Sequence, residues 1–352
     1  MKKLSSRYKR LFFMQRLSPG EFKTLISKER KSHFITPFAL VYKTFCDLGY
    51  DQKNSDYFLN NPSEYIIAMR KNCWKEFEPF EKEFTTRMLS YLIDEERIKD
   101  MSPYDAIRDF TMEYPTHIYD LALSNTQSRR SRAGKEFESI LELLMMGAGI
   151  PVDVQGAIGK SFFQKNQIGK LVDLVMPGVV QYTSNKRNTM LISAKTTLRE
   201  RWQEVPEEVN RTGIREMYLA TLDDSFSEET INILYEANVV VVTTIENKNF
   251  KYKNNNRVLT FEDMLQSAME LSRKWNNVSY TDSEKEEIQR SILKQIEKYS
   301  DFPYVVNYYR NRLSALWGLT LSGTKTHVKQ RFLPLTPLLM VSDVLWSPVL
   351  PA

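Results

Sequence analysis

Four successive valines at positions 239–242 restrict the fold more than any other stretch of this chain. A strand with one face in water alternates apolar and polar side chains, whereas this run is apolar on both faces and is typical of a strand buried in a parallel or mixed sheet. Further strand-like runs lie at 169–176, 189–195 and 216–221. A helix over 227–237 joins the run at 216–221 to the valine run. This order of strands and helices predicts an α/β fold in which a mixed sheet is flanked by helices.

Helical regions flank the predicted sheet. Residues 1–128 carry apolar side chains at helical spacing, interrupted before Pro103 and Pro115, and a helix from about 132 to 146 leads into the sheet. A further amphipathic helix is expected over 282–299. We therefore predict three parts, which are an N-terminal helical subdomain over 1–128, an α/β core over 129–310 and a C-terminal tail of unclear role over 311–352.

The composition excludes several classes of protein. The chain carries 49 Lys and Arg against 44 Asp and Glu, and this net charge of +5 weakly favours a polyanionic partner. Cys46 and Cys73 are the only cysteines, so a disulfide scaffold is excluded. His33, His117 and His327 lack the spacing of metal ligands, which argues against a zinc site or a histidine-based triad. No run approaches the ~18 apolar residues of a membrane span, so we expect no membrane partner and a cytoplasmic protein.

An acid and a lysine lie on two neighbouring predicted strands. Asp173 stands within the apolar run 169–176, and Lys195 ends the apolar run 189–195. A lysine leaving a buried strand is expected to meet an anion or a metal site, because a charged group is costly to bury without a partner. Hydrolysis of a phosphodiester needs an activated water and stabilisation of charge on the phosphorus oxygens, which carboxylates holding Mg²⁺ and a nearby lysine supply. The two residues therefore predict a metal-dependent phosphodiesterase.

Such a site needs a second carboxylate. The nearest candidates are Glu204, Glu207 and Glu208 on a helix predicted after the lysine, and Glu138 on the helix before the sheet adds a fourth. Each feature alone also has an ordinary interpretation, such as a solvent-facing acid on an edge strand or a strand-end lysine that reaches water. Their order and spacing, rather than any one residue, favour a nuclease.

The combination of motifs resembles the restriction endonucleases of the EcoRII/SsoII type, which are related to the CCGG-cutting enzymes and have the PD-(D/E)xK nuclease fold. The resemblance covers most of residues 60–245 and rests on Arg132–Glu138, Asp173, Ser193–Lys195, Arg199–Arg201 and Glu208. Ser193 occupies the position where many PD-(D/E)xK nucleases have an acid, and in this family a glutamate on the following helix replaces it. The resemblance implies that Asp173 and Glu208 bind Mg²⁺. Lys195 would be the catalytic lysine and Glu138 an accessory acid.

Arg199, Glu200 and Arg201 suit the recognition of two G·C pairs in the major groove. Arginine can donate two hydrogen bonds to guanine, and glutamate can accept one from cytosine. By the resemblance, Arg199 and Glu200 read the inner pair of a CC/GG step and Arg201 reads the outer pair. CCNGG is the favoured target, while CCWGG and CCGG stay open because these residues read only the shared pairs. Their place shortly after Lys195 would tie recognition to cleavage.

A further match lies on a helix expected to begin near residue 62. Arg70 and Trp74 are spaced i, i+4 and so share one helix face, where they can hold a flat ring between them. SsoII-like enzymes that cut CCNGG use such a pair for the extruded central base, which implies base flipping here. By the same analogy Gln127 would probe the minor groove, and the basic stretch 128–132 would meet DNA phosphates.

We therefore predict a homodimeric type II restriction endonuclease that cleaves double-stranded DNA ahead of the first cytosine of its site and leaves a 5′ overhang. A palindromic target favours a two-fold protein, and pairing of dimers into tetramers stays open. A cognate DNA methyltransferase would belong to the same restriction–modification system but is not expected to bind the enzyme. Two alternatives remain, a catalytically inactive sequence-specific DNA-binding protein of this fold and a nonspecific repair nuclease.

Overall fold

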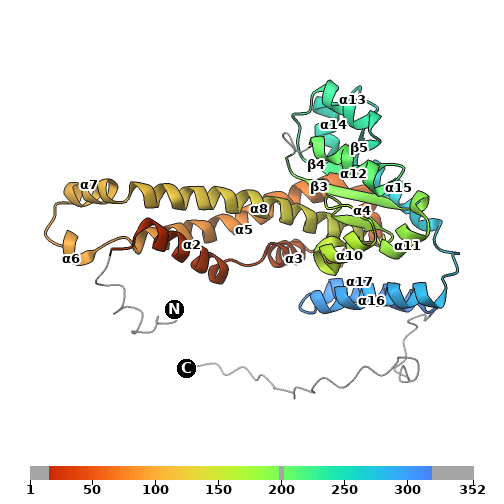
Figure 1. The fold of residues 1–352 in the computed structure, drawn as a ribbon, viewed down its shortest axis with the longest axis horizontal. Coiled ribbons are helices and arrows are strands. Elements are labelled where there is room, and N and C mark those ends of the chain that lie inside the picture. The colour runs from red at the N-terminus through yellow and green to blue at the C-terminus, as the bar shows by residue number, and fades with distance from the viewer. Residues whose placement is uncertain (1–15, 198–201, 319–352) are drawn as a thin grey trace, which may run out of the picture.

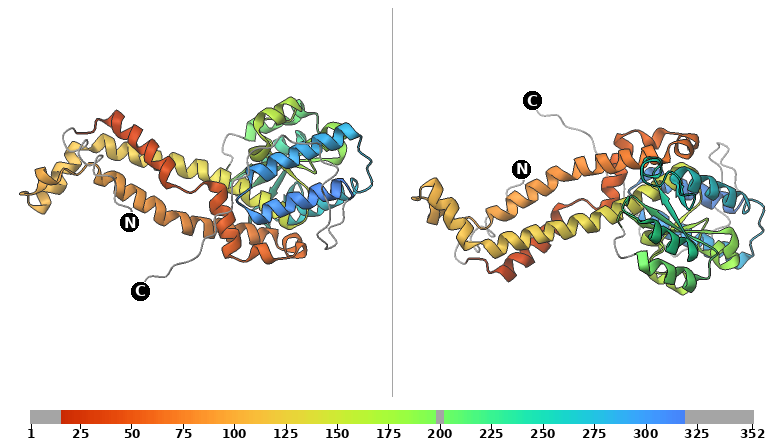
Figure 2. Two further views of the ribbon diagram at one scale, coloured as in Figure 1. Left: turned by 90° about the horizontal axis from the view of Figure 1, so that it is seen from below. Right: turned by 90° about the horizontal axis from the view of Figure 1, so that it is seen from above.

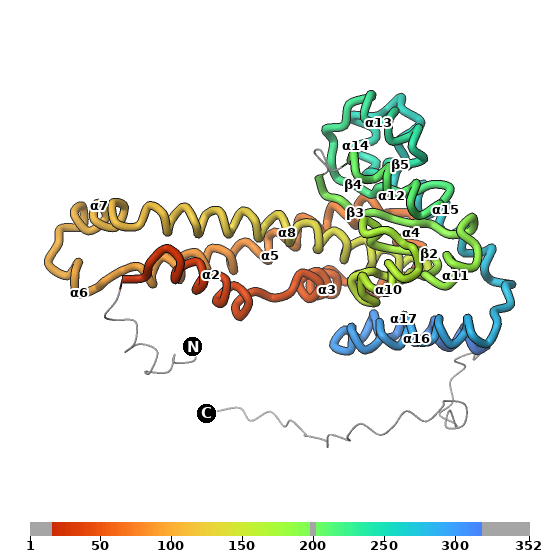
Figure 3. Tube along the Cα trace, viewed as in Figure 1, coloured from red at the N-terminus to blue at the C-terminus, as the bar shows by residue number. Residues whose placement is uncertain are grey.

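The computed structural model describes residues 16–197 and 202–318. A long helical arm extends from a compact α/β part (Figure 1). The helices of the arm and its base are α2 (Pro19–His33), α3 (Pro37–Asp47), α4 (Ser55–Asn60), α5 (Pro62–Ser90), α6 (Glu95–Ile98), α7 (Pro103–Glu113) and α8 (Pro115–Gly147). The chain trace in Figure 3 runs outward along α5, turns through α6 and α7, and returns along α8, against which α5 packs. The helical N-terminal region that the sequence predicts is confirmed.

Prolines mark the starts of the arm helices. Pro103 and Pro115 each lie in the first turn of a helix, where the missing N–H costs nothing. The sequence predicted helical structure up to residue 128 and a separate helix from about 132, but α8 runs without a break from Pro115 to Gly147, because no glycine or proline between 116 and 131 ends it. The predicted boundary at residue 128 therefore falls inside one continuous helix.

The sheet is mixed, as predicted. Its six strands, which lie side by side in chain order, are β1 (Asp153–Val154), β2 (Leu174–Met176), β3 (Met190–Lys195), β4 (Met217–Thr221), β5 (Val239–Thr243) and β6 (Val258–Thr260). The pairs β1–β2 and β2–β3 are antiparallel, whereas β3 to β6 run parallel. The sequence did not indicate β1 and β6, because two or three residues are too few to display a strand pattern.

Helices cover both faces of the sheet. Those between the first strand and residue 273 are α9 (Gln155–Ile158), α10 (Lys160–Lys165), α11 (Val179–Ser184), α12 (Glu204–Thr212), α13 (Glu228–Glu236), α14 (Ile245–Lys251) and α15 (Phe261–Arg273). Ile192 and Val242 pack in one core with α8 and α15, whereas Leu191 and Val241 pack in a second core with α12 and α13. All four side chains are at most 1% exposed, so the strands are buried on both faces as their apolar sequence predicts.

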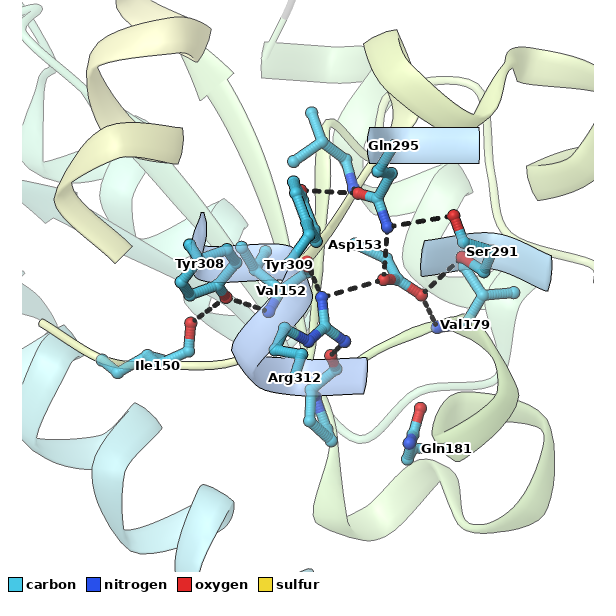
Figure 4. A network of polar contacts seen from close by, with 12 residues as sticks. Ile150, Val152, Asp153, Val179, Gln181, Ser291, Gln295, Tyr308, Tyr309 and Arg312 are labelled. Carbon is cyan, nitrogen blue, oxygen red and sulfur yellow. Dashed lines mark hydrogen bonds and ion pairs between the residues drawn. The ribbon is translucent and has the colours of Figure 1, made fainter. Parts of the chain in front are cut away.

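Two C-terminal helices, α16 (Asp282–Lys298) and α17 (Pro303–Leu316), lie side by side on the α/β part (Figure 2). A buried polar network attaches them to β1 (Figure 4). Asp153 accepts hydrogen bonds from Arg312 Nη1 at 3.2 Å and from Gln295 Nε2 at 3.0 Å. The predicted tail from residue 311 therefore begins too early, because Arg312 of α17 contacts the sheet.

Candidate active site

Asp173 and Lys195 meet where β2 and β3 pair. Asp173 precedes β2 rather than standing in its middle, and its N–H donates to Ile192 O at 2.9 Å in the β3 backbone. The Lys195 ammonium donates to Asp173 Oδ2 at 2.8 Å, and the backbone N–H of Ala194 donates to the same oxygen at 2.7 Å. The two side chains are 18% and 12% exposed. Among the described residues, Oδ2 is thus held by two donors and Oδ1 is the oxygen left for another ligand.

Glu138 brings a second carboxyl group to this place from α8. Burial, followed by the negative charge of Asp173, raises the pKa of Glu138 to about 7, and the ammonium of Lys195 opposes this shift. Burial likewise raises the pKa of Asp173, while Lys195 lowers it. Two carboxyl groups crowded in a buried place disfavour their own ionisation unless a further cation neutralises them. The pair therefore fits a divalent cation with oxygen ligands.

Glu208 on α12 lies beside the loop that leads to Asp173. It is 4% exposed, and its Oε1 accepts a hydrogen bond from the Leu171 N–H at 3.0 Å. Its Oε2 pairs with the Arg211 guanidinium. Gly169 allows this approach, because a Cβ at that position would overlap the Glu208 carboxylate.

Asp173 contacts Lys195 directly and the charges of both act on Glu138, whereas Glu208 contacts the loop before Asp173. Across residues 16–197 and 202–318, no group of three or more His, Cys, Asp or Glu side chains is arranged to hold a metal ion. A cation bound by Asp173 and Glu208 would have to replace the ion pair between Glu208 and Arg211.

The predicted base-holding pair lies on α5, the outward helix of the arm. Trp74 is 42% exposed. Arg70 Nη1 donates to Ala133 O at 3.3 Å and lies 3.7 Å from Glu136 Oε2 on α8. Among the described residues, the cation over the Trp74 ring is that of Arg129, whose guanidinium carbon lies 5.2 Å from the ring centroid. The structure therefore does not bring Arg70 over Trp74.

Gln127 is exposed on α8 and lines a cavity of about 740 Å³ between α2 and α8. Basic side chains surround this cavity, namely Lys23, Arg30, Lys31, Arg132 and Lys135. Sequence reasoning missed the contribution of α2, since nothing in its local pattern distinguishes these lysines from a solvated helix face. Arg132 differs from the prediction for the basic stretch, because it is only 8% exposed and its Nε donates to Glu136 Oε1 at 3.1 Å.

The predicted base-reading residues Arg199, Glu200 and Arg201 lie outside the described residues. In the part of the chain that the structure describes, no helix combines the length and the apolar character that crossing a membrane requires.

Comparisons with known proteins identify the family of the chain and the fold that it shares. The family model described as EcoRII C terminal matches residues 103–265. A structure of metal-depleted Ecl18kI in complex with uncleaved, modified DNA is 97% identical, covers 85% of this chain and 100% of that chain, and has a TM-score of 0.82. A second, with uncleaved DNA, is 96% identical over the same shares with a TM-score of 0.81. A complex of restriction endonuclease PspGI with substrate DNA shares the fold at 17% identity, with a TM-score of 0.50 over 68% of this chain and 94% of that chain.

Proposed function

This chain belongs to the restriction endonuclease family of the EcoRII C-terminal type, and on that premise we propose that it cleaves double-stranded DNA at a short palindromic site containing CC/GG, with CCNGG favoured. As a member of this family it is a site-specific deoxyribonuclease that binds DNA. The contact between the Lys195 ammonium and the Asp173 carboxylate carries the proposed mechanism.

Lys195 has the position and charge to stabilise the transition state of phosphodiester hydrolysis. Its ammonium donates one hydrogen bond to Asp173 Oδ2 and one, at 3.0 Å, to the Ala194 carbonyl. These two bonds fix the position of the ammonium and use two of its three protons. The third can approach a non-bridging phosphate oxygen as negative charge develops there. Glu138, with a pKa of about 7, can accept a proton from an attacking water near neutral pH.

The proposed metal is Mg²⁺, and its ligands would be Asp173 and Glu208 with Glu138 as an accessory acid. When bound, Mg²⁺ would supply Lewis-acid polarisation of the phosphate. The raised pKa values of Glu138 and Asp173 support this proposal, because a divalent cation would offset the burial of both carboxylates and the effect of the Asp173 charge on Glu138. Arg211 would release Glu208 as the cation binds.

DNA recognition is proposed to combine three groups of residues. Arg199, Glu200 and Arg201 would read the CC/GG pairs in the major groove. Arg70 and Trp74 would form the pocket for a flipped central base, and Gln127 would probe the minor groove. In this division the helical arm supplies DNA contacts and the pocket, the α/β part supplies cleavage and base recognition, and residues beyond 318 have no assigned role.

A homodimer is proposed because a palindromic site presents two identical strands to be cut. Each subunit would contribute one active site, and the two arms would approach the central base pair from either side. The cognate methyltransferase is proposed to share the target sequence without binding the nuclease.

Digestion of a plasmid of known sequence tests the proposal. With Mg²⁺ the protein should yield discrete fragments, and sequencing of their ends should locate the cut ahead of the first cytosine of CCNGG. Lys195→Ala should reduce cleavage about 100-fold or more while retaining site binding in a gel-shift assay. Lys298→Ala, which removes an exposed lysine at the end of α16, is the matched control.

Three outcomes would oppose the proposal. A smear of fragments would favour a nonspecific nuclease, and the absence of cleavage with intact binding would favour an inactive DNA-binding protein. Full cleavage by Lys195→Ala would refute the assigned role of Lys195.

A further inference from the structure

Trp74 is covered on one ring face by a side chain from the neighbouring helix of the arm. The guanidinium carbon of Arg129 on α8 lies 5.2 Å from the Trp74 ring centroid. A guanidinium at that distance is attracted to the ring by a cation–π interaction. Trp74 nevertheless stays 42% exposed, so the contact lies at the surface where DNA can reach it.

Glu81 anchors the Arg129 side chain through a single oxygen. Arg129 Nε donates to Glu81 Oε2 at 2.6 Å, and Nη2 of the same guanidinium pairs with this oxygen as well. Glu81 is 3% exposed, and its Oε1 is buried without a hydrogen-bond partner among the described residues. The second oxygen of this carboxylate is therefore buried without a hydrogen bond in the DNA-free protein, with the Arg30 guanidinium as a further cation near Glu81.

Arg70, the other member of the proposed pocket, is held away from this contact. Its guanidinium donates a hydrogen bond to the Ala133 carbonyl and lies 3.7 Å from Glu136 Oε2. Arg129 and Arg70 are thus paired with separate carboxylates, Glu81 and Glu136.

We propose that Arg129 is a place-holder for the extruded base. In the DNA-free protein its guanidinium covers a face of Trp74, and a flipped base takes that face while Arg129 moves toward Glu81 Oε1. This inference rests on the base pocket proposed above. The stacking that an extruded base gains on Trp74 must exceed the Arg129 contact that it displaces, so Arg129 adds a fixed cost to base extrusion.

The expected effect has the size of one exposed cation–π contact, which corresponds to about two- to fivefold in an equilibrium constant. Arg129→Met removes the contact, and Arg130→Met is the matched control because Arg130 is an exposed neighbour of the same charge. The comparison of these two variants cancels the loss of one positive charge near DNA phosphates.

Two duplexes separate the place-holder role from a general DNA contact. One contains 2-aminopurine at the central position of the site, and the other contains an abasic site there. Affinities are measured without a divalent cation, so that no cleavage occurs. Relative to Arg130→Met, Arg129→Met should bind the 2-aminopurine duplex about two- to fivefold more tightly and the abasic duplex equally well.

A DNA-free measurement checks the contact itself. Acrylamide quenching of the Trp74 fluorescence, obtained by difference from Trp74→Phe, should increase in Arg129→Met and remain at the wild-type level in Arg130→Met. Glu81→Gln, which weakens the anchor but keeps Arg129, should change quenching in the same direction as Arg129→Met. Glu64→Gln is its control, since Glu64 is exposed in the first turn of the same helix.

The outcomes distinguish this inference from the proposed function. If the wild-type protein does not brighten 2-aminopurine on binding, both the flipping pocket and the place-holder fail. If the wild type brightens the probe but the two arginine variants bind both duplexes in the same ratio, only the place-holder is overturned. Weaker binding of the 2-aminopurine duplex by Arg129→Met would make Arg129 a support of the base instead.

Discussion

Glu208 accepts a hydrogen bond from the backbone N–H of Leu171, 3.0 Å away, and so lies against the loop that precedes Asp173. This contact joins α12 to the segment before β2, although 37 positions separate the two residues in the chain. The approach is close because Gly169 has no side chain at the point where the carboxylate sits. Glu208 is therefore positioned by the loop as well as by its own helix.

Gly169→Ala should displace Glu208 and thereby reduce cleavage. The added Cβ would overlap the carboxylate, and small displacements of groups in an active site can cost on the order of 100-fold in rate. Single-turnover cleavage at saturating DNA measures the effect. Gly20→Ala is the control, because a Cβ at that position meets nothing within 4 Å. Unchanged cleavage by a folded Gly169→Ala protein would show that Glu208 is not needed.

The Mg²⁺ requirement should depend on pH through Glu138. Its pKa of about 7 lies above the ordinary value, so below pH 7 the carboxyl is largely protonated and a proton competes with the cation. The Mg²⁺ concentration for half-maximal cleavage should fall by up to about tenfold per pH unit as pH rises toward 7, and then level off. Glu138→Gln should lose this dependence. A wild-type profile that persists in the variant would assign the titration to another group.

The sheet could be predicted from sequence where its strands are buried on both faces. Val241 and Val242 belong to a continuous apolar run, and the chain on either side of it turns polar, so both the strand and its burial could be read from local pattern. β1 could not be predicted because two residues are too few to show an alternation of apolar and polar side chains. Its position depends instead on pairing with β2 and on contacts from α16 and α17.

The site was predictable to the extent that its residues follow strands. Asp173 and Lys195 flank a pair of adjacent strands, so sheet pairing alone brings them together. The contact between Arg129 and Trp74 was not predictable, because it requires the register between α5 and α8. That register is set by packing along the whole arm, and no local pattern reports it.

Trp74→Ala should weaken binding to cognate DNA by about 1–3 kcal/mol, the usual contribution of one stacked base. The Mg²⁺ dependence of cleavage should stay unchanged, because Trp74 lies on the arm and not beside Asp173. Trp317→Ala is a matched control, since Trp317 is 43% exposed and lies at the end of α17. Equal affinity of the two variants in a fluorescence anisotropy assay would argue against a flipping pocket at Trp74.

Arg312→Met should destabilise the fold, because it leaves the Asp153 carboxylate buried without its cation. Asp153 is 3% exposed, and Arg312 also donates from Nη2 to Pro177 O at 3.1 Å. Removing one partner of a buried ion pair costs about 3–5 kcal/mol in the free energy of unfolding. Arg310→Met, at an exposed position of the same helix, should change little. Urea denaturation of the DNA-free protein measures both.

A double variant separates the loss of charge pairing from the loss of packing. Asp153→Asn combined with Arg312→Met leaves no unpaired charge, yet the amide oxygen can still accept from the Val179 N–H, which lies 3.0 Å from Asp153 Oδ2. The double variant should therefore recover part of the stability that Arg312→Met alone loses. If it is no more stable than the single variant, the arginine acts mainly by packing against Tyr308 and Tyr309, whose ring centroids lie 5.9 and 5.7 Å from its guanidinium carbon.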